Sequence, residues 1–364
     1  MHPAGLRGER LVRAAAHFGR VWAKLSQEER VAEAAVVELA RALIDIDSTT
    51  GSEAAACRFL AEELKGRGYA VVEQPVSEGR FNVLALVEPE PAVVMSTHID
   101  CVPPFFPSRV EAGVLYGRGA CDAKGALAAQ VIAAGRLREE GHRHVGLLFV
   151  VGEERGSDGA AAANGLGPGA RFLLNGEPTE SQLGRSTRGA LRVRLRAAGR
   201  AAHSSQPERG DNAIDRLVDA LVALRRLPLP EDPELGRTFY AIGLVSGGIA
   251  PNVVAPFAEA EVLFRTIGPG REVVERLAGL QPGVTAEIVL EVPPVRMRTL
   301  PGFASRHFAF TTDIPLLPSW GEPLLFGPGS ILDAHTDDDH VRLDELEAAA
   351  DTYAAIARTL LAQA

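Results

Sequence analysis

A histidine and an aspartate close the apolar segment PAVVMSTHID, where His98 and Asp100 are two residues apart. On an extended backbone, residues two positions apart face the same side of a strand. One use of such a pair is a metal site, in which the histidine binds the ion and a nearby carboxylate accepts the other ring proton. The other interpretation is a buried pair in which each group only satisfies the other. The segment alone leaves both interpretations open.

Carboxylates stand at comparable positions further along the chain. Asp122 lies in the glycine-rich stretch GRGACDAKGA before a predicted helix, Glu153 and Glu154 follow the apolar strand HVGLLFVVG, and Glu177 follows FLLNG. Each has an ordinary alternative, a helix cap for Asp122 and a solvated loop for the glutamates. Adjacent carboxylates are costly to bury unless cations pair with them. Because neighbouring side chains diverge, Glu153 and Glu154 would have different tasks.

A second histidine, His335, lies in GPGSILDAHTDDDHV, where the run of acids by itself predicts a solvated face. Taken together, the strand and loop ends supply two histidines and three or four carboxylates. Such nitrogen and oxygen donors suit zinc, and also cobalt or manganese. Five ligands are too many for one tetrahedral zinc with an open position. They fit two ions that share a bridging carboxylate, about 3.5–4 Å apart, as in two-metal hydrolases.

The elements that must position these groups alternate between helix and strand. Helices are predicted over 27–46, 52–68 and 125–141, and strands over 69–74, 81–88, 92–98 and 144–154. Near-continuous apolar strands that alternate with helices predict an α/β fold, with a mixed, mostly parallel sheet covered by helices on both faces. In such sheets functional groups collect beyond the carboxyl ends of the strands.

Residues 188–296 follow a different pattern, βαββαβ, which is the ferredoxin-like split unit. In its first strand Leu191, Val193 and Leu195 alternate with arginines, so one face is buried and one is wet. We therefore predict an inserted domain over 188–296 and a metal-binding catalytic domain made of 32–187 and 297–364. Residues 1–31 are predicted as an N-terminal helical extension, with one helix over 11–25 and a capping box, Ser26 and Glu29, that begins the next.

Composition excludes several classes of protein. The net charge of −9 argues against a nucleic acid or an anionic membrane as partner. No apolar run reaches the length of a membrane helix. The three cysteines, Cys57, Cys101 and Cys121, are odd in number and far apart, so a reducing, cytoplasmic location is expected.

A resemblance joins these motifs. In order and spacing, STHID, GRGACDAKG, GEE, NGEPTE, GRAAHSS, GGIAPNVV and the late GPG…AHT resemble the dinuclear zinc amidohydrolases and peptidases. This family includes acetylornithine deacetylase, succinyl-diaminopimelate desuccinylase, aminoacylase and the glutamate carboxypeptidases. The resemblance covers about residues 32–364. It implies a zinc-exopeptidase-like catalytic domain with an inserted ferredoxin-like lid and dimerisation domain.

The resemblance also implies roles for single residues of the catalytic domain. Asp122 bridges both metals and is followed by a cis peptide, Asp100 orients His98, and Glu153 is the general base and later the proton donor to the leaving amine. The remaining metal ligands are His98 and Glu177 for one ion and Glu154 and His335 for the other. The chain departs from the family at Asp339, where relatives often carry glutamate.

In the inserted domain, the resemblance places His203 as a residue that crosses to the partner's active site and stabilises the oxyanion. Asn252 and Arg265 match positions that hold the substrate carboxylate, a task that suits the arginine fork. Arg188, near the predicted domain junction, is a candidate for binding an acidic acyl group. From the residues alone, His203 can equally be a surface histidine, Asn252 a turn residue and Arg188 a hinge surface residue.

The expected function is hydrolysis of the amide bond of an N-acyl amino acid by a homodimer that binds two divalent ions, zinc foremost. A dipeptidase or carboxypeptidase with the same site is the nearest alternative. A non-catalytic metal-binding relative is the alternative from another class, although Glu153 and every ligand position are filled.

Overall fold

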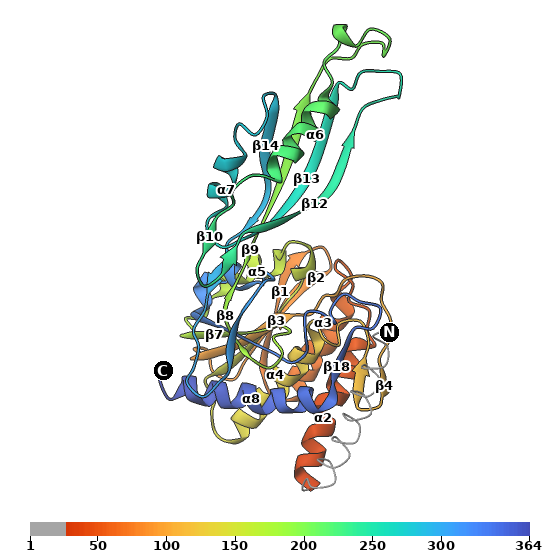
Figure 1. The fold of residues 1–364 in the computed structure, drawn as a ribbon. Helices are drawn as coiled ribbons and strands as arrows, with labels where there is room; N and C mark the ends of the chain where they lie inside the picture. Colours follow the sequence, from red (N-terminus) through yellow and green to blue (C-terminus); the bar gives the residue numbers. More distant parts are fainter. Residues whose placement is uncertain (1–26) are drawn as a thin grey trace, which may run out of the picture. The chain divides into compact units, whose positions relative to one another are not determined.

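The structure is a computed structural model that describes residues 27–364, drawn in Figure 1. The chain forms two compact units. One contains the described residues up to Arg185 together with Met297–Arg306 and Thr312–Ala364, and the other contains Ser186–Arg296 and His307–Thr311. The predicted helix over 11–25 lies outside the described residues.

The first unit is built on a six-stranded sheet with the order β1-β2-β6-β3-β7-β17. The strands β6, β3, β7 and β17 run parallel to one another, whereas β2 pairs antiparallel with both β1 and β6. The bounds are β1 Ala70–Ser77, β2 Arg80–Leu86, β3 Val93–His98, β6 Val145–Val150, β7 Phe172–Gly176 and β17 Glu322–Phe326. The predicted mixed, mostly parallel sheet is confirmed.

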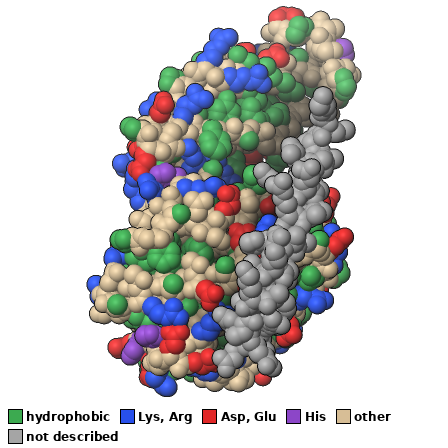
Figure 2. Space-filling view, turned by 60° about the horizontal axis from the view of Figure 1, so that its bottom comes forward, with side chains coloured by type: hydrophobic (Ala, Val, Ile, Leu, Met, Phe, Trp, Pro, Cys, Tyr) green, Lys and Arg blue, Asp and Glu red, His purple; other side chains and the backbone are tan. Residues whose placement is uncertain are grey.

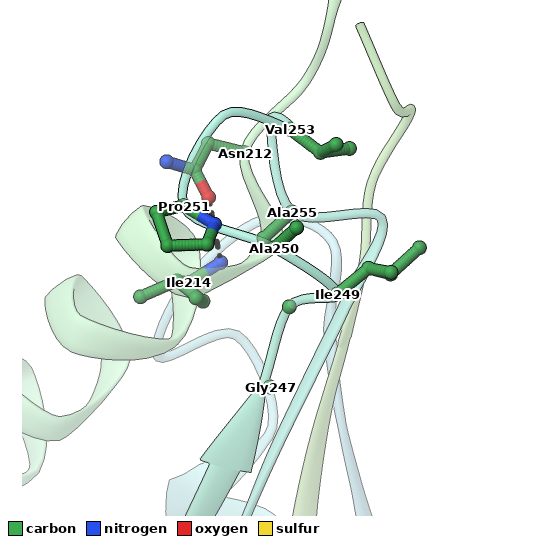
Figure 3. Close-up of a pocket in the computed structure, with 9 residues that line it drawn as sticks. Asn212, Ile214, Gly247, Ile249, Ala250, Pro251, Val253 and Ala255 are labelled. Atoms are coloured by element: carbon green, nitrogen blue, oxygen red, sulfur yellow. Dashed lines mark hydrogen bonds between the residues drawn. The ribbon is translucent and has the colours of Figure 1, made fainter.

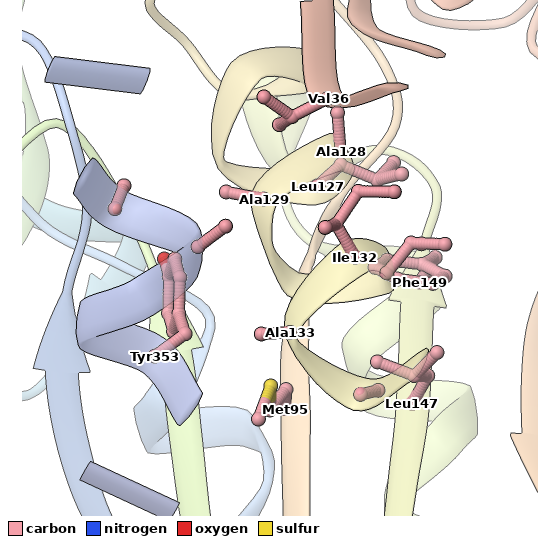
Figure 4. Packing of buried hydrophobic residues seen from close by; sticks show 14 of the residues in the cluster. Val36, Met95, Leu127, Ala128, Ala129, Ile132, Ala133, Leu147, Phe149 and Tyr353 are labelled. Atoms are coloured by element: carbon pink, nitrogen blue, oxygen red, sulfur yellow. The ribbon is translucent and has the colours of Figure 1, made fainter. Parts of the chain in front are cut away.

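Apolar side chains alternate between two cores on the two faces of this sheet. Met95 and Leu147 belong to the larger core, which they share with four helices, and Figure 4 shows them beside residues of α4 and α8. Val94 and Leu148 belong to the smaller core with Trp320. The helices of the larger core are α2 (Gln27–Ile44), α3 (Ala54–Gly66), α4 (Lys124–Glu139) and α8 (Leu343–Leu361), and α5 (Asp158–Ala163) contributes to the smaller one. Burial on both faces explains why the parallel strands β6, β3 and β7 are mostly apolar, whereas the edge strand β1 is largely exposed.

One buried cation holds α2 against the start of α4. Lys124 is 1% exposed, and its ammonium donates to the carbonyl oxygens of Leu43 at 2.9 Å and Ile46 at 3.0 Å. Carbonyl groups at the end of a helix lack partners within the helix. The lysine satisfies these carbonyls at the residue where α4 begins, two positions after Asp122.

A three-stranded sheet in the order β18-β5-β4 joins distant parts of the chain. Its strands are β4 (Arg109–Glu111), β5 (Val114–Tyr116) and β18 (His340–Arg342), and β18 pairs antiparallel with β5. The sheet therefore carries the end of the acidic run HTDDD to the glycine-rich loop that precedes Asp122.

The second unit has the element order β9, α6, β12, β13, α7, β14 and a four-stranded antiparallel sheet in the order β12-β13-β9-β14. This is the predicted βαββαβ arrangement. Residues of α6 and α7 pack with one face of the sheet in a single core. The bounds are β9 Gly189–Ala198, α6 Ala213–Leu224, β12 Phe239–Gly247, β13 Phe257–Thr266, α7 Gly270–Leu277 and β14 Val284–Val292.

Shorter strands complete the described chain. They are β8 (Leu183–Thr187), β10 (Glu231–Asp232), β11 (Gly236–Arg237), β15 (Val295–Arg296) and β16 (Ser305–Phe308). No helix within residues 27–364 combines the length and apolar character needed to cross a membrane. Figure 2 shows acidic and basic side chains interspersed on the face drawn. All three cysteines are buried thiols.

Candidate metal centre

His98 ends β3 with its ring fixed from one side. Its Nδ1 lies 3.0 Å from the backbone carbonyl oxygen of Asp100. Because a carbonyl oxygen only accepts, the neutral ring carries its proton on Nδ1 and keeps a lone pair on Nε2. That Nε2 lies 3.0 Å from Asp122 Oδ1 and 3.9 Å from Glu177 Oε2. A buried imidazole of fixed tautomer, with its lone pair among carboxylates, has the arrangement of a metal-binding histidine.

Asp122 presents one carboxylate oxygen to each of two imidazoles. Oδ1 is 3.0 Å from His98 Nε2, and Oδ2 is 3.4 Å from His335 Nε2. The loop before it turns through Gly117 and Gly119 at φ of 150° and 87°, conformations that favour glycine. The peptide bond after Asp122 is cis, as the resemblance implies. The carboxylate therefore lies between two groups that can each bind a metal.

Glu153 and Glu154 lie in a short 3₁₀ turn, Glu153–Arg155, after β6. Their backbone N–H groups donate to the carboxylate of Asp100, Glu153 at 3.0 Å and Glu154 at 3.2 Å. The side chain of Glu154 reaches His335, with 2.9 Å between Oε1 and Nε2. One acidic side chain of the pair thus faces a histidine, in keeping with the different tasks expected for the two residues.

Glu177 follows β7 and is 4% exposed. Its Oε2 faces His98, while its Oε1 is buried without a hydrogen-bond partner among the described residues. A buried carboxylate oxygen with no partner is costly. Burial accordingly raises the pKa of Glu177 well above its ordinary value, and the neighbouring Asp122 adds to the rise. A cation near His98 would satisfy this oxygen.

His335 lies in the loop between β17 and β18 and has the left-handed φ of 60°. It projects its ring toward the two carboxylates from a more open position, since its side chain is 46% exposed. Hydrogen bonds with Asp122 and Glu154 raise the pKa of His335 to about 10. The loop therefore brings the second imidazole to the acidic cluster although no regular element carries it.

The cluster concentrates negative charge in a buried place. Burial raises the pKa of Glu153 well above its ordinary value and raises that of Glu154. Burial also opposes ionisation of Asp122, but the imidazoles of His335 and His98 outweigh it and lower the Asp122 pKa. Donor atoms of His98, Asp122 and Glu154 all lie within 4.8 Å of one another. Nitrogen and oxygen donors gathered in this way fit a divalent cation.

Two buried aspartates, Asp313 and Asp339, lie near the cluster. The sequence did not indicate either of them as a functional residue. Asp313 is 1% exposed, and neither carboxylate oxygen has a hydrogen-bond partner among the described residues. Burial raises the pKa of Asp313 to about 6. Asp339, where the chain departs from the family, contacts the loop before Asp122. The only signal for Asp313 in the sequence is a single acid before the apolar run IPLL in the stretch TTDIPLL.

In the second unit, the structure brings His203 and Asn252 together. His203 pairs with Val253 in an isolated bridge, and the N–H of Ser204 donates to the carbonyl oxygen of Asn252 at 3.0 Å. The N–H of Ser205 donates to His203 Nδ1 at 3.2 Å. A backbone N–H can only donate, so the neutral ring carries its proton on Nε2. Both His203 and Asn252 are exposed.

The two predicted substrate arginines make contacts within this unit. Arg188 donates to the carbonyl oxygens of Arg237, at 3.0 Å, and Leu235, and its guanidinium lies over the ring of Phe239. Arg265 donates to Thr311 Oγ1 at 3.3 Å. The contacts of Arg188 tie β9 to the β10–β11 hairpin, which is a structural use of the side chain.

Comparisons with known proteins give a consistent result. The sequence profile of Peptidase family M20/M25/M40 matches residues 94–359. A peptidase M20 domain-containing protein of Schizosaccharomyces pombe is 36% identical over 324 residues, which cover 85% of this chain and 81% of that protein. A probable carboxypeptidase of Aspergillus fumigatus is 35% identical, covering 86% of this chain and 84% of its own.

Solved structures share the fold at lower identity. Aminopeptidase PepT of Bacillus cereus aligns with a TM-score of 0.76 at 19% identity, covering 90% of this chain and 99% of that one. A dinuclear metal-binding M20 peptidase of Bacillus subtilis aligns with a TM-score of 0.69 at 16% identity, covering 92% and 99%.

Imidazole and carboxylate donors gather beyond the parallel strands of the sheet, and the chain has peptidases as relatives. Together these observations define a metallohydrolase that acts on amide bonds. The protein belongs to Peptidase family M20/M25/M40.

Proposed function

We propose that this protein hydrolyses an amide bond whose amine side carries a free carboxylate, as in an N-acyl amino acid or at the C-terminus of a short peptide. The observation that carries the proposal is the position of Asp122, with one oxygen toward His98 and the other toward His335. One carboxylate between two imidazole sites is the arrangement that a pair of metal ions requires.

Two sets of residues would hold the ions. One set is His98, Asp122 and Glu177, and the other is His335, Asp122 and Glu154. The unpartnered buried oxygen of Glu177 supports the fit, because a cation would supply its missing partner. The donor types favour zinc, with cobalt or manganese as substitutes. Bound there, divalent ions polarise the amide carbonyl and lower the pKa of a water molecule.

Glu153 is the residue proposed to move the proton. It is adjacent to the ligand Glu154, and its backbone N–H is fixed by Asp100 at 3.0 Å. Burial raises the pKa of Glu153 well above its ordinary value, which suits a group that must take a proton from water and give it to the departing amine. Asp100 thereby positions both the base and His98.

His203 is proposed to donate its Nε2 proton to the oxyanion in the active site of a partner protomer. The Ser205 N–H on Nδ1 supports this role, because it leaves Nε2 as the ring donor. Asn252, beside His203, and Arg265 are proposed to bind the substrate carboxylate, which a guanidinium can bind in bidentate fashion. Arg188 is a weaker candidate for the acyl group because carbonyl oxygens already occupy its guanidinium.

A homodimer through the second unit is the proposed assembly. The edge strand β12 and helix α6 expose large apolar side chains, which are Leu244, Val245, Ile214, Val218 and Val222. The three on α6 are spaced four residues apart and form one stripe. Ile214 and the loop that contains Ile249 line a pocket of about 470 Å³. Figure 3 shows these side chains. An exposed apolar area with an unpaired strand edge suits a second copy of the chain.

The peptide alternative has its own support. Several relatives are named probable carboxypeptidases, and a carboxypeptidase substrate also has a free carboxylate on the amine side of the scissile amide. A dipeptidase would differ by requiring a free amino group on the acyl side. Blocking that amino group therefore distinguishes a dipeptidase, which would lose its substrate, from a carboxypeptidase, which would not.

The test is a substrate panel with metal reconstitution. Metal-free protein is loaded with Zn²⁺ or Co²⁺ and assayed on N-acetyl and N-succinyl amino acids, on dipeptides, and on the same dipeptides with an acetylated N-terminus. Turnover of acylated substrates, and loss of turnover when their carboxylate is amidated, is the expected result. Metal binding without turnover of any member would favour a non-catalytic relative and overturn the proposal.

A further inference from the structure

The side chain of Asp339 binds the loop that leads to Asp122. Its Oδ2 accepts the backbone N–H of Gly119 at 2.9 Å, and its Oδ1 accepts that of Cys121 at 2.9 Å. The guanidinium of Arg118 lies 3.3 Å from the same Oδ2. Asp339 is 1% exposed although two exposed aspartates precede it. Each carboxylate oxygen thus has a defined partner in a buried place.

These loop amides depend on an acceptor from outside the loop. Because Gly117 and Gly119 adopt positive φ, the loop follows neither a helical nor a strand path. The N–H groups of Arg118 and Ala120 donate to the carbonyl oxygens of Phe106 and Gly117, at 3.1 Å and 3.0 Å, whereas those of Gly119 and Cys121 donate to the carboxylate of Asp339. Buried backbone N–H groups need partners. Hydrogen bonds from amides to a carboxylate are charge-assisted and shorter and stronger than neutral ones. Asp339 therefore fixes the path of the backbone up to Cys121.

The same residue belongs to the segment that carries His335. Asp339 directly precedes β18, which pairs with β5, and its carbonyl oxygen accepts the N–H of Gly117 at 3.0 Å. His335 lies four residues earlier in this segment. The backbone and the side chain of Asp339 together fasten the segment of His335 to the loop of Asp122.

Arg118 completes this connection and balances its charge. Besides facing Asp339, its Nε donates to the carbonyl oxygen of Pro104 at 3.1 Å, and its guanidinium lies over the ring of Phe106 at 4.9 Å. The arginine is 2% exposed. A buried carboxylate with an arginine and two amides as partners is fully satisfied within the protein, so it has no need to bind a metal itself.

From this geometry we infer that Asp339 is a positioning residue of the metal centre, which sets the separation of Asp122 and His335 by holding the Gly119–Cys121 backbone. The inference rests on the proposed function, because the residues that it positions are the proposed ligands. Asp339 makes no hydrogen bond to the side chain of Asp122 or of His335 and acts through the backbone between them. Its effect must therefore appear in metal affinity and coordination, beyond any effect on stability.

The test uses Asp339→Asn and Asp339→Glu in the full chain, with Asp338→Asn as the control. Asp338 is the exposed neighbour, and its carboxylate lies 3.9 Å from Arg109. An asparagine would turn an NH₂ group toward one of the two amides, whereas a glutamate keeps both acceptors. Affinity for Zn²⁺ is measured by competition with a chromophoric chelator, the Co²⁺ absorption spectrum is recorded, and thermal unfolding of the metal-free proteins is followed.

We expect the asparagine variant to bind Zn²⁺ about 10- to 100-fold more weakly and to show an altered Co²⁺ spectrum. The glutamate variant should recover part of the affinity, and the Asp338 control should match the wild type. A folded asparagine variant with wild-type affinity and spectrum would overturn the inference, even if its unfolding midpoint fell. If the asparagine variant does not fold, the glutamate variant decides the question. A lowered Zn²⁺ affinity of the glutamate variant supports the inference, and an unchanged affinity together with an unchanged Co²⁺ spectrum overturns it. Failure of the wild type to bind two ions would instead contradict the proposed function.

Discussion

The carboxylate of Asp100 accepts the backbone N–H of Glu153 at 3.0 Å. The same carboxylate accepts the N–H of Glu154 at 3.2 Å and the hydroxyl of Thr50 at 2.8 Å. The backbone carbonyl oxygen of Asp100 faces His98 Nδ1. One residue after β3 therefore fixes the turn after β6, and the proposed base and two proposed ligands depend on its position.

Replacement of Asp100 by asparagine should weaken the site with little change in shape. One amide of the turn would face the NH₂ group of the new side chain, so Glu153 and Glu154 would lose a defined position. We expect catalytic efficiency or metal affinity to fall by about 10- to 100-fold. The measurement is kcat/KM at increasing Zn²⁺ concentrations on the preferred substrate. Wild-type values for both quantities would contradict the role given to this carboxylate.

Asp313 should make the stability of the metal-free protein depend on pH. Its pKa is raised from 3.8 to about 6 by burial, so the folded state holds this proton more tightly than the unfolded chain. The favourable contribution is present below about pH 4 and is lost as pH rises to about 6. The loss amounts to about 3 kcal/mol at most.

The corresponding measurement compares the wild type with Asp313→Asn by thermal unfolding in a chelator, between pH 4 and pH 8. The unfolding midpoint of the variant should rise relative to that of the wild type across the interval from about pH 4 to about pH 6 and then keep a constant offset. Parallel midpoints over the whole range would show that Asp313 ionises in the folded protein as it does in the unfolded chain.

Mixed dimers test whether His203 acts on the partner protomer. His203→Ala and Glu153→Ala are each expected to be inactive alone. In a mixed dimer, one site combines an intact Glu153 with the intact histidine of the partner. Statistical exchange should then restore about one quarter of wild-type activity. Subunit exchange is checked independently by native mass spectrometry, and exchanged dimers without activity would exclude action across the dimer.

The sequence predicted the central sheet because its parallel strands β3, β6 and β7 are buried on both faces and form nearly continuous apolar runs. It also indicated His98, Glu153 and Glu177 as candidates, since polar groups after parallel strands gather at one edge of the sheet. His335 lies on a loop with a left-handed residue, and no periodic pattern fixes its direction.

Residues outside this pattern were harder to predict. Asp339 stands in an acidic run that predicts exposure, yet pairing of β18 with β5 buries only this aspartate of the three. Asp313 follows no strand of the central sheet. Arg188 is engaged by the carbonyl oxygens of a hairpin about fifty residues away, and tertiary contacts of that kind leave no local signature.

The most direct test of the account is the comparison of wild type with Glu153→Gln, both loaded with Zn²⁺, for bound metal and for turnover of the preferred substrate. The account predicts two ions per chain in both proteins and a loss of turnover of about 10²- to 10⁴-fold in the variant. Wild-type turnover by a fully loaded Glu153→Gln protein would contradict it.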